Sequence, residues 1–193
     1  DTKKYLQKLK DKGYIIVIAT GRILKSAKDI TDGAKFANYI IADSGSTIYD
    51  TKYKEIISES IISQSDLIKI CKEYESNWGI LEICDKKWCN VYTNLKYKIR
   101  EYDNFILNIN DFLNNKQEIT HISIIPKQDC VYKIIDKLKK ELPNLKVSLM
   151  QDSFSDLKYI EIHNNEINKY EGIKLIANKE KVEKHTIGEL LPM

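Results

Sequence analysis

The stretch Tyr14-Ile15-Ile16-Val17-Ile18-Ala19-Thr20-Gly21-Arg22 decides the fold of this chain. Its first part is a run of Ile and Val residues, which is typical of a strand buried inside a parallel sheet. The run ends in a hydroxyl residue, a glycine and an arginine. Open α/β sheets bind ligands at the carboxyl ends of their strands, so the stretch predicts an α/β sheet with a ligand at this strand end.

The three residues after the strand suit a phosphate-like anion. The Thr20 hydroxyl can donate to an anionic oxygen, Gly21 lets the backbone turn, and Arg22 offers a planar fork of donors. Only Arg22 and Arg100 are arginines among 31 basic residues, which favours a specific role at the strand end. An alternative stays open, because Thr and Gly also occur at such junctions for backbone reasons alone.

Composition limits the classes of partner. The 193 residues include 31 basic and 28 acidic ones with a net charge of +3, and the lysines are scattered among the acids. This pattern does not indicate a nucleic-acid-binding surface. The sequence has no apolar stretch long enough to span a membrane and no signal-peptide pattern. We expect a soluble, cytoplasmic protein of one large or two small domains, and nothing in the sequence indicates its oligomeric state.

The four cysteines do not form a metal-binding signature, because none of them are paired at Cys-x-x-Cys spacing. Cys84 and Cys89 flank residues 85–87, which resemble a hairpin turn, so the two side chains are expected to be neighbours on adjacent strands. We expect a reduced, buried pair, and a redox role is the alternative.

The first fifty residues predict a βαβ unit. A helix begins at Asp1 or Thr2 and ends at Gly13, and the strand 14–19 follows it. A second helix is expected at about residues 23–36, before the apolar strand Tyr39–Ala42. Residues 43–46 then form a turn and residues 47–49 a short strand.

The middle of the chain predicts an α+β insert at residues 51–157. Ser65 is expected to cap a helix, and two hairpin strands follow it. The remaining expected elements are a helix at 97–113, a strand at 120–125, a helix at 130–142 and a strand at 146–150.

The last segment returns to α/β structure, with a strand at 159–163, a helix that opens at residues 167–169 and a short strand at 185–189. Lys169 lies at the amino end of this helix, where a positive charge opposes the helix dipole. Such a lysine is explained by an anion that both the ammonium group and the helix terminus bind. The alternative is that it is one of many exposed lysines.

In this order the segments resemble the haloacid dehalogenase (HAD) superfamily, and within it the Cof-type phosphatases with an inserted cap domain. The matching motifs are residues 19–22, 39–50, 160–162 and 168–173, around an insert of suitable length. The resemblance implies a Rossmann-like parallel-sheet core from residues 1–50 and 158–193 and an α+β cap from residues 51–157. It also implies hydrolysis of phosphate monoesters of small metabolites, such as sugar phosphates, with Mg²⁺ and an aspartyl-phosphate intermediate.

The resemblance also implies roles for individual residues. Thr20 matches the hydroxyl of the family's second motif, which binds the transferred phosphoryl group, and Gly21 and Arg22 are its usual companions. Lys169 matches the lysine of the third motif, which neutralises the nucleophile and the phosphate. Ser44–Gly45 stands where many members have Asn-Gly beside the substrate phosphate, so Ser44 departs from the pattern.

Two acidic motifs of the family are incomplete in this sequence. The Asp-x-Asp of the first motif is absent, and the fourth motif is reduced to Glu189, the expected metal ligand. We therefore expect the nucleophilic aspartate to lie outside these 193 residues. The alternatives are a non-catalytic phospho-ligand-binding protein on a degenerate HAD scaffold and a structural or interaction protein.

Overall fold

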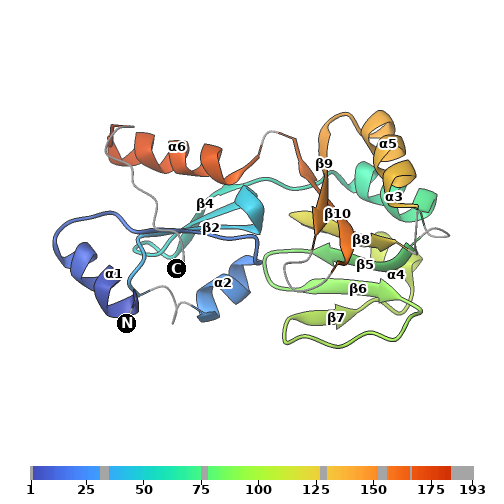
Figure 1. Cartoon of the computed structure of the whole chain (residues 1–193), viewed down its shortest axis with the longest axis horizontal. Coiled ribbons are helices and arrows are strands. Elements are labelled where there is room, and N and C mark those ends of the chain that lie inside the picture. Colours follow the sequence, from blue (N-terminus) through green and yellow to red (C-terminus); the bar gives the residue numbers. More distant parts are fainter. Residues whose placement is uncertain are drawn as a thin grey trace.

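The computed structural model describes residues 2–30, 35–74, 78–126, 130–151, 156–165 and 167–183. Two β-sheets lie side by side along the long axis of the molecule, and the chain passes between them twice (Figure 1). Helices accompany both sheets, so the predicted α/β class is confirmed. None of the helices in the described ranges is long and apolar enough to cross a membrane.

The first sheet has four strands in the order β1-β2-β3-β4. β1 pairs in parallel with β2, and the remaining pairs are antiparallel. Both central strands are completely buried: β2 is apolar on both faces, whereas β3 also buries the polar side chains of Thr47 and Asp50. The elements of this half before the crossing are α1 (Thr2–Asp11), β1 (Val17–Ala19), α2 (Leu24–Ile30), β2 (Tyr39–Ala42), a 3-10 turn η1 (Asp43–Gly45), β3 (Thr47–Asp50) and β4 (Glu55–Glu59).

The second sheet has six strands in the order β7-β6-β5-β8-β10-β9. Alternate residues of the strands point from one face of this sheet into a core that the helices also line. These residues are Leu81, Ile83, Ile122, Ile124, Ile160 and Ile162. The elements are α3 (Gln64–Tyr74), β5 (Trp78–Cys84), β6 (Cys89–Thr93), β7 (Asp103–Phe105), α4 (Ile109–Leu113), β8 (His121–Pro126), α5 (Val131–Glu141), β9 (Leu145–Gln151) and β10 (Lys158–Asn164).

The last helix, α6 (Lys169–Glu180), returns to the first sheet. Ile176 packs there against Tyr39, Ile41 and Ile48, and the Tyr39 hydroxyl donates a hydrogen bond to Glu180. The Asn168 side chain caps the helix by accepting a hydrogen bond from the Glu171 amide at 3.0 Å. This cap fixes where α6 begins, at Lys169.

Two strands lie in a different sheet from the one expected. The strand at 159–163 was expected to belong with the first sheet, but β10 pairs with β8 and β9 of the second, where Ile160 opposes Ile124. Conversely, β4 lies inside the predicted insert and pairs with β3 of the first sheet. The reason is that a strand's own pattern shows which side chains are buried and not which strand it pairs with. The division into core and cap domains itself stays a prediction.

Two further local expectations are wrong. Residues 97–113 form β7 and the short α4 in place of one helix, because Asp103 accepts a hydrogen bond from the Arg100 amide in a tight turn and Asn108 starts a new helix. Ser63, rather than Ser65, caps α3, since its hydroxyl accepts from the Asp66 amide at 3.1 Å. The strand expected at 185–189 lies outside the described residues.

Candidate functional site

Two loops at the carboxyl ends of β1 and β2 are joined by backbone hydrogen bonds. The Thr20 amide donates to the Ile41 carbonyl at 2.9 Å, and the Ser44 amide donates to the Thr20 carbonyl at 3.1 Å. The Asp43 amide donates to the Arg22 carbonyl at 2.9 Å. Loop 20–22 and loop 43–45 therefore form one unit at the sheet edge where α/β proteins bind ligands.

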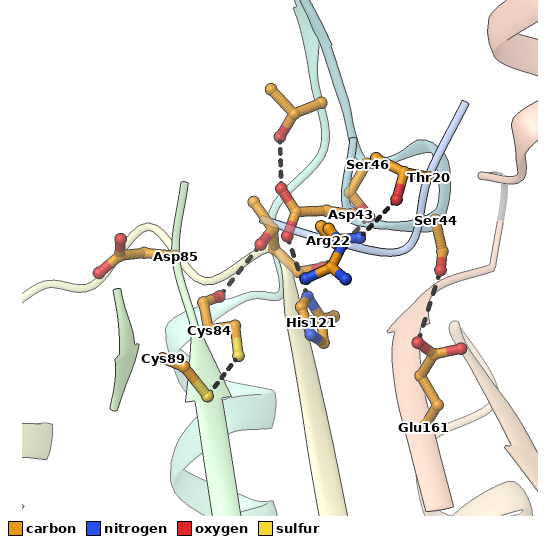
Figure 2. A network of polar contacts seen from close by, with 12 residues as sticks. Thr20, Arg22, Asp43, Ser44, Ser46, Cys84, Asp85, Cys89, His121 and Glu161 are labelled. Atoms are coloured by element: carbon orange, nitrogen blue, oxygen red, sulfur yellow. Dashed lines mark hydrogen bonds and ion pairs between the residues drawn. The ribbon is translucent and has the colours of Figure 1, made fainter. Parts of the chain in front are cut away.

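The side chains of this unit lie close together (Figure 2). The Thr20 hydroxyl accepts a hydrogen bond from the Arg22 amide at 3.2 Å, which leaves its own O–H group able to donate to a ligand. A Cβ atom at Gly21 would lie 3.4 Å from the Ser44 hydroxyl oxygen, so the Ser44 side chain lies against the turn. Gly21 and Arg22 are exposed. The unit thus offers hydroxyl and guanidinium donors to an anion.

Gly45 brings the start of α6 to the same place. It has a φ of +118°, and a Cβ atom built on it would lie 2.5 Å from the Asn168 carbonyl carbon. Only glycine allows this approach. Lys169 follows Asn168 directly and has an exposed side chain. The structure therefore brings together Thr20, Ser44 and the segment that carries Lys169, although 149 positions separate Thr20 from Lys169 in the sequence. Their roles stay predictions.

Glu161 reaches this unit from the second sheet. Its carboxylate accepts a long hydrogen bond of 3.5 Å from the Ser44 hydroxyl, as Figure 2 shows. Glu161 lies on β10, in the strand that was expected to belong with the first sheet. The pairing of β10 with the second sheet therefore places a carboxylate of that sheet beside the loops of the first.

A buried ion pair joins the two sheets behind the loops. The Asp43 carboxylate lies 3.1 Å from Nδ1 of His121 and also accepts a hydrogen bond from the Thr47 hydroxyl. Burial, the largest influence, lowers the pKa of His121, but the hydrogen bond and the charge of Asp43 outweigh it, and the net pKa is raised. Asp43 and Ser44 both have positive φ, 49° and 56°, which is strained for residues other than glycine.

Sequence reasoning missed both members of this pair. The available signal was an acidic residue directly after the fully apolar strand Tyr39–Ala42, at the same position along the sheet as Thr20. No local pattern marks His121 as its partner, because the two residues are 78 positions apart.

The hairpin of β5 and β6 makes a second contact between the sheets. Ile23 packs against Cys84, Cys89 and Val91, and the Lys25 amide donates to the Lys86 carbonyl at 3.0 Å. The expected neighbour relation of the two cysteines is confirmed, since they oppose each other in the strand register with their sulfurs 3.0 Å apart. The hydrogen bond to Cys89, and then burial, raise the pKa of the Cys84 thiol.

The described residues do not fit a magnesium site. No group of three Asp, Glu, His or Cys side chains in the described ranges is placed to hold a metal ion. The Asp43 carboxylate already bonds His121 and Thr47. Glu189, the expected ligand, lies outside the described residues. The roles derived below are therefore those of the chain's own residues, and the Mg²⁺ requirement stays an expectation from the family resemblance.

Comparisons with known proteins agree with this fold. The family model of the haloacid dehalogenase-like hydrolases matches residues 1–187. One relative is YcsE of Bacillus subtilis (strain 168), which is named a 5-amino-6-(5-phospho-D-ribitylamino)uracil phosphatase. It is 25% identical over 183 residues, and the match covers 83% of this chain and 72% of YcsE.

Solved structures show the same likeness of fold. A haloacid dehalogenase-like hydrolase from Bacteroides thetaiotaomicron superposes with a TM-score of 0.73 at 12% identity, over 93% of this chain and 69% of that one. The HAD subclass IIB sugar phosphatase BT4131 superposes with a TM-score of 0.68 at 13% identity, over 95% of this chain and 70% of its own. The chain thus spans about 70% of the length of these proteins.

Proposed function

The chain belongs to the haloacid dehalogenase-like hydrolases, and from that premise we propose that it carries the phosphate-binding residues of a Mg²⁺-dependent phosphatase acting on phosphate monoesters of small metabolites. The observation that supports this most strongly is the contact of Gly45 with Asn168, which joins loop 43–45 to the start of α6. It brings the segment that carries Lys169 to the loops that carry Thr20, Arg22 and Ser44. Phosphoryl transfer requires such donors around the phosphoryl oxygens.

Each residue has a separate role in this proposal. The Thr20 hydroxyl donates to an oxygen of the transferred phosphoryl group, and Gly21 and Arg22 bind its other oxygens. Lys169 places its ammonium charge beside the phosphate and the attacking carboxylate, which lowers the repulsion between two anions. Ser44 lies against the Gly21 turn with its hydroxyl directed to Glu161, and Gly45 holds the α6 segment close.

The nucleophile in this proposal is an aspartate outside the 193 residues, which forms the aspartyl-phosphate typical of the family. The position of β1 supports this, because β1 is the edge of the described sheet and is only half-buried, whereas its neighbour β2 is fully buried. A further strand paired with β1 would place a carboxylate next to Thr20. The magnesium requirement rests on the family relationship, with Glu189 as one expected ligand.

The second sheet acts in this proposal as a cap over the phosphate-binding loops. Glu161 already contacts Ser44 across the two sheets, so the cap supplies groups to the site itself. The name of YcsE describes a phosphate monoester on a ribityl chain, which supports a small phosphorylated metabolite as the class of substrate here.

The decisive experiment measures phosphate release from p-nitrophenyl phosphate by the full-length gene product with and without Mg²⁺. Magnesium-dependent turnover is expected. Absence of turnover, together with an increase in melting temperature on addition of phosphate, would overturn the proposal in favour of a non-catalytic phospho-ligand-binding protein.

A further inference from the structure

One face of the second sheet carries a row of polar side chains across four adjacent strands. Glu82 on β5, Ser123 on β8, Glu161 on β10 and Ser148 on β9 are directly opposite one another in the register. The opposite face holds the apolar core. A polar row in the centre of a sheet needs hydrogen-bonding partners, because burying unpaired polar groups is costly.

This polar face is turned toward the phosphate-binding loops. Glu161 bonds Ser44, and His121 on the neighbouring strand bonds Asp43. His163 lies two residues beyond Glu161 on the same face, and the antiparallel register of β10 with β8 places it beside His121. The face therefore meets the same loops through several side chains.

Part of the face is satisfied by the protein itself. The Glu82 carboxylate accepts hydrogen bonds from the Arg100 guanidinium at 2.7 Å and from the Tyr97 hydroxyl at 2.9 Å. His121 is paired with Asp43. These groups have little capacity left for a ligand.

Glu161 and His163 differ from Glu82 and His121 because their polar groups are less completely hydrogen-bonded. Within the described part of the chain, the long bond from Ser44 is the one hydrogen bond of the Glu161 carboxylate, which has no cationic partner there. His163 is 4% exposed, and its Nδ1 atom has no hydrogen-bond partner among the described residues. Two adjacent side chains on this face thus keep unused hydrogen-bonding capacity.

The chemistry of the two groups indicates what they can bind. Burial lowers the pKa of His163, so its imidazole is neutral near pH 7 and has one donor and one acceptor nitrogen. The Glu161 carboxylate only accepts. Hydroxyl groups both donate and accept, so they match the pair, whereas a second anionic group on the ligand would be repelled by Glu161.

We propose that Glu161 and His163 select the alcohol half of the substrate by binding the hydroxyls of a neutral, polyhydroxylated phosphomonoester and excluding phosphomonoesters with a second negative charge. The proposal rests on the phosphatase function proposed above. Its geometric basis is that the Ser44 side chain lies against the Gly21 turn and also bonds Glu161. In this proposal, the ester substituent of a phosphate held at Thr20 and Gly21 is directed toward Glu161.

Sorbitol 6-phosphate and 6-phosphogluconate test this selection, because they share the phosphorylated end and differ at the other in a CH₂OH group against a carboxylate. We expect kcat/KM of the full-length protein to favour sorbitol 6-phosphate by about tenfold or more. Glu161→Gln keeps the size and removes the charge, so it lowers this ratio about tenfold, mainly by improving hydrolysis of 6-phosphogluconate.

The charge-matched control is Glu141→Gln on α5, which covers the other face of the second sheet, and it leaves the ratio unchanged. A wild-type preference for 6-phosphogluconate, or a ratio that Glu161→Gln does not change, overturns the selection alone. Failure to hydrolyse these compounds and p-nitrophenyl phosphate overturns the phosphatase function and the selection together.

His163 is tested with two variants. Asn places an amide where Nδ1 lies, and Phe fills the volume without a hydrogen bond. We expect His163→Phe to lower kcat/KM for sorbitol 6-phosphate about tenfold, and His163→Asn to lose clearly less. Equal losses would remove His163 from the proposal. Melting temperatures of both variants show whether they fold, and the Glu161 variants test the selection independently of that result.

Discussion

The two zones in which the sheets meet differ in how completely their polar groups are paired. In the paired zone, Asp43 bonds His121 and the Ser46 hydroxyl donates to the Thr120 carbonyl, and all of these residues are buried. In the open zone, Thr20, Ser44, Lys169 and Glu161 are exposed or half-buried, and a long hydrogen bond of 3.5 Å joins Ser44 to Glu161 across the sheets. The paired zone fixes the loops, and in the proposed function the open zone keeps donors for a ligand.

Lys169→Ala tests the open zone with the largest expected effect. Removal of an ammonium group beside the transferred phosphoryl group lowers kcat of the full-length protein about 10³-fold. The free energy of unfolding changes by less than about 0.5 kcal/mol, because the side chain is exposed. Phosphate release and urea unfolding measure the two quantities.

Lys174→Ala is the matched control for this variant. Lys174 lies on the same helix, is also exposed, and bonds Glu171 at 2.9 Å. Its removal is expected to leave kcat unchanged. An unchanged kcat in Lys169→Ala would show that Lys169 is an ordinary surface lysine and would remove it from the site.

Gly45→Ala tests the link between the zones. The added Cβ would lie 2.5 Å from the Asn168 backbone at a φ of +118°, so we expect a loss of about 3 kcal/mol in the free energy of unfolding. Gly13→Ala is the control, since Gly13 has a φ of +87° with no atom within 4 Å of the added Cβ, and it costs about 1 kcal/mol. Equal losses in urea unfolding would show that the contact with Asn168 contributes nothing.

The open zone was largely predictable from the sequence, and the paired zone was not. Thr20, Gly21 and Arg22 follow an apolar strand, and Lys169 opens a helix, so local patterns identified them. Their proposed role requires accessible side chains at strand and helix ends, which short motifs make visible. Ser44 and Gly45 were found only through the resemblance to a family.

The paired zone depends on contacts between distant segments. His121 and Ser123 alternate with isoleucines, which indicates a strand but not what its polar face meets. β10 was placed with the wrong sheet for the same reason, because its apolar residues would suit either core. Glu161 and His163 were therefore missed as candidates, although the alternation of the strand 159–163 was recognised.

Thr20→Val tests the open zone through a smaller expected loss of activity. It removes one hydroxyl that donates to an anionic oxygen, so kcat/KM of the full-length protein falls about 10- to 100-fold. Thr20→Ser keeps the hydroxyl and retains more of the activity. Because the Thr20 hydroxyl also accepts from the Arg22 amide, urea unfolding of both variants separates a local loss of structure from a loss of binding. Equal activity of the Val and Ser variants would contradict a role for the hydroxyl.

The smallest expected effect is a difference in how two buried histidines of the same sheet face, His121 in the paired zone and His163 beside it, respond to pH. The pKa of His121 is raised above its ordinary 6.5, since the hydrogen bond and charge of Asp43 outweigh the larger influence of burial, and Glu161 and Glu82 add to the increase. The pKa of His163 is lowered below 6.5, mainly by burial, with Glu161 acting against this and His121 and Lys146 adding to it.

These opposite shifts give opposite contributions to stability. The contribution of His121 is fully present below pH 6.5 and is lost as the pH rises through its raised pKa. The contribution of His163 is present above pH 6.5 and is lost as the pH falls through its lowered pKa. We therefore expect the free energy of unfolding of the wild type, measured in urea between about pH 5 and pH 9, to be highest near the ordinary pKa of histidine.

Two variants separate the contributions. His121→Gln removes the loss on the alkaline side and keeps the loss on the acidic side, so its stability rises with pH up to about neutrality. His163→Asn does the reverse, and its stability falls as the pH rises, because His121 then titrates without an opposing group. If both variants kept the wild-type pH profile, neither histidine would be coupled to folding in the way that its neighbours require.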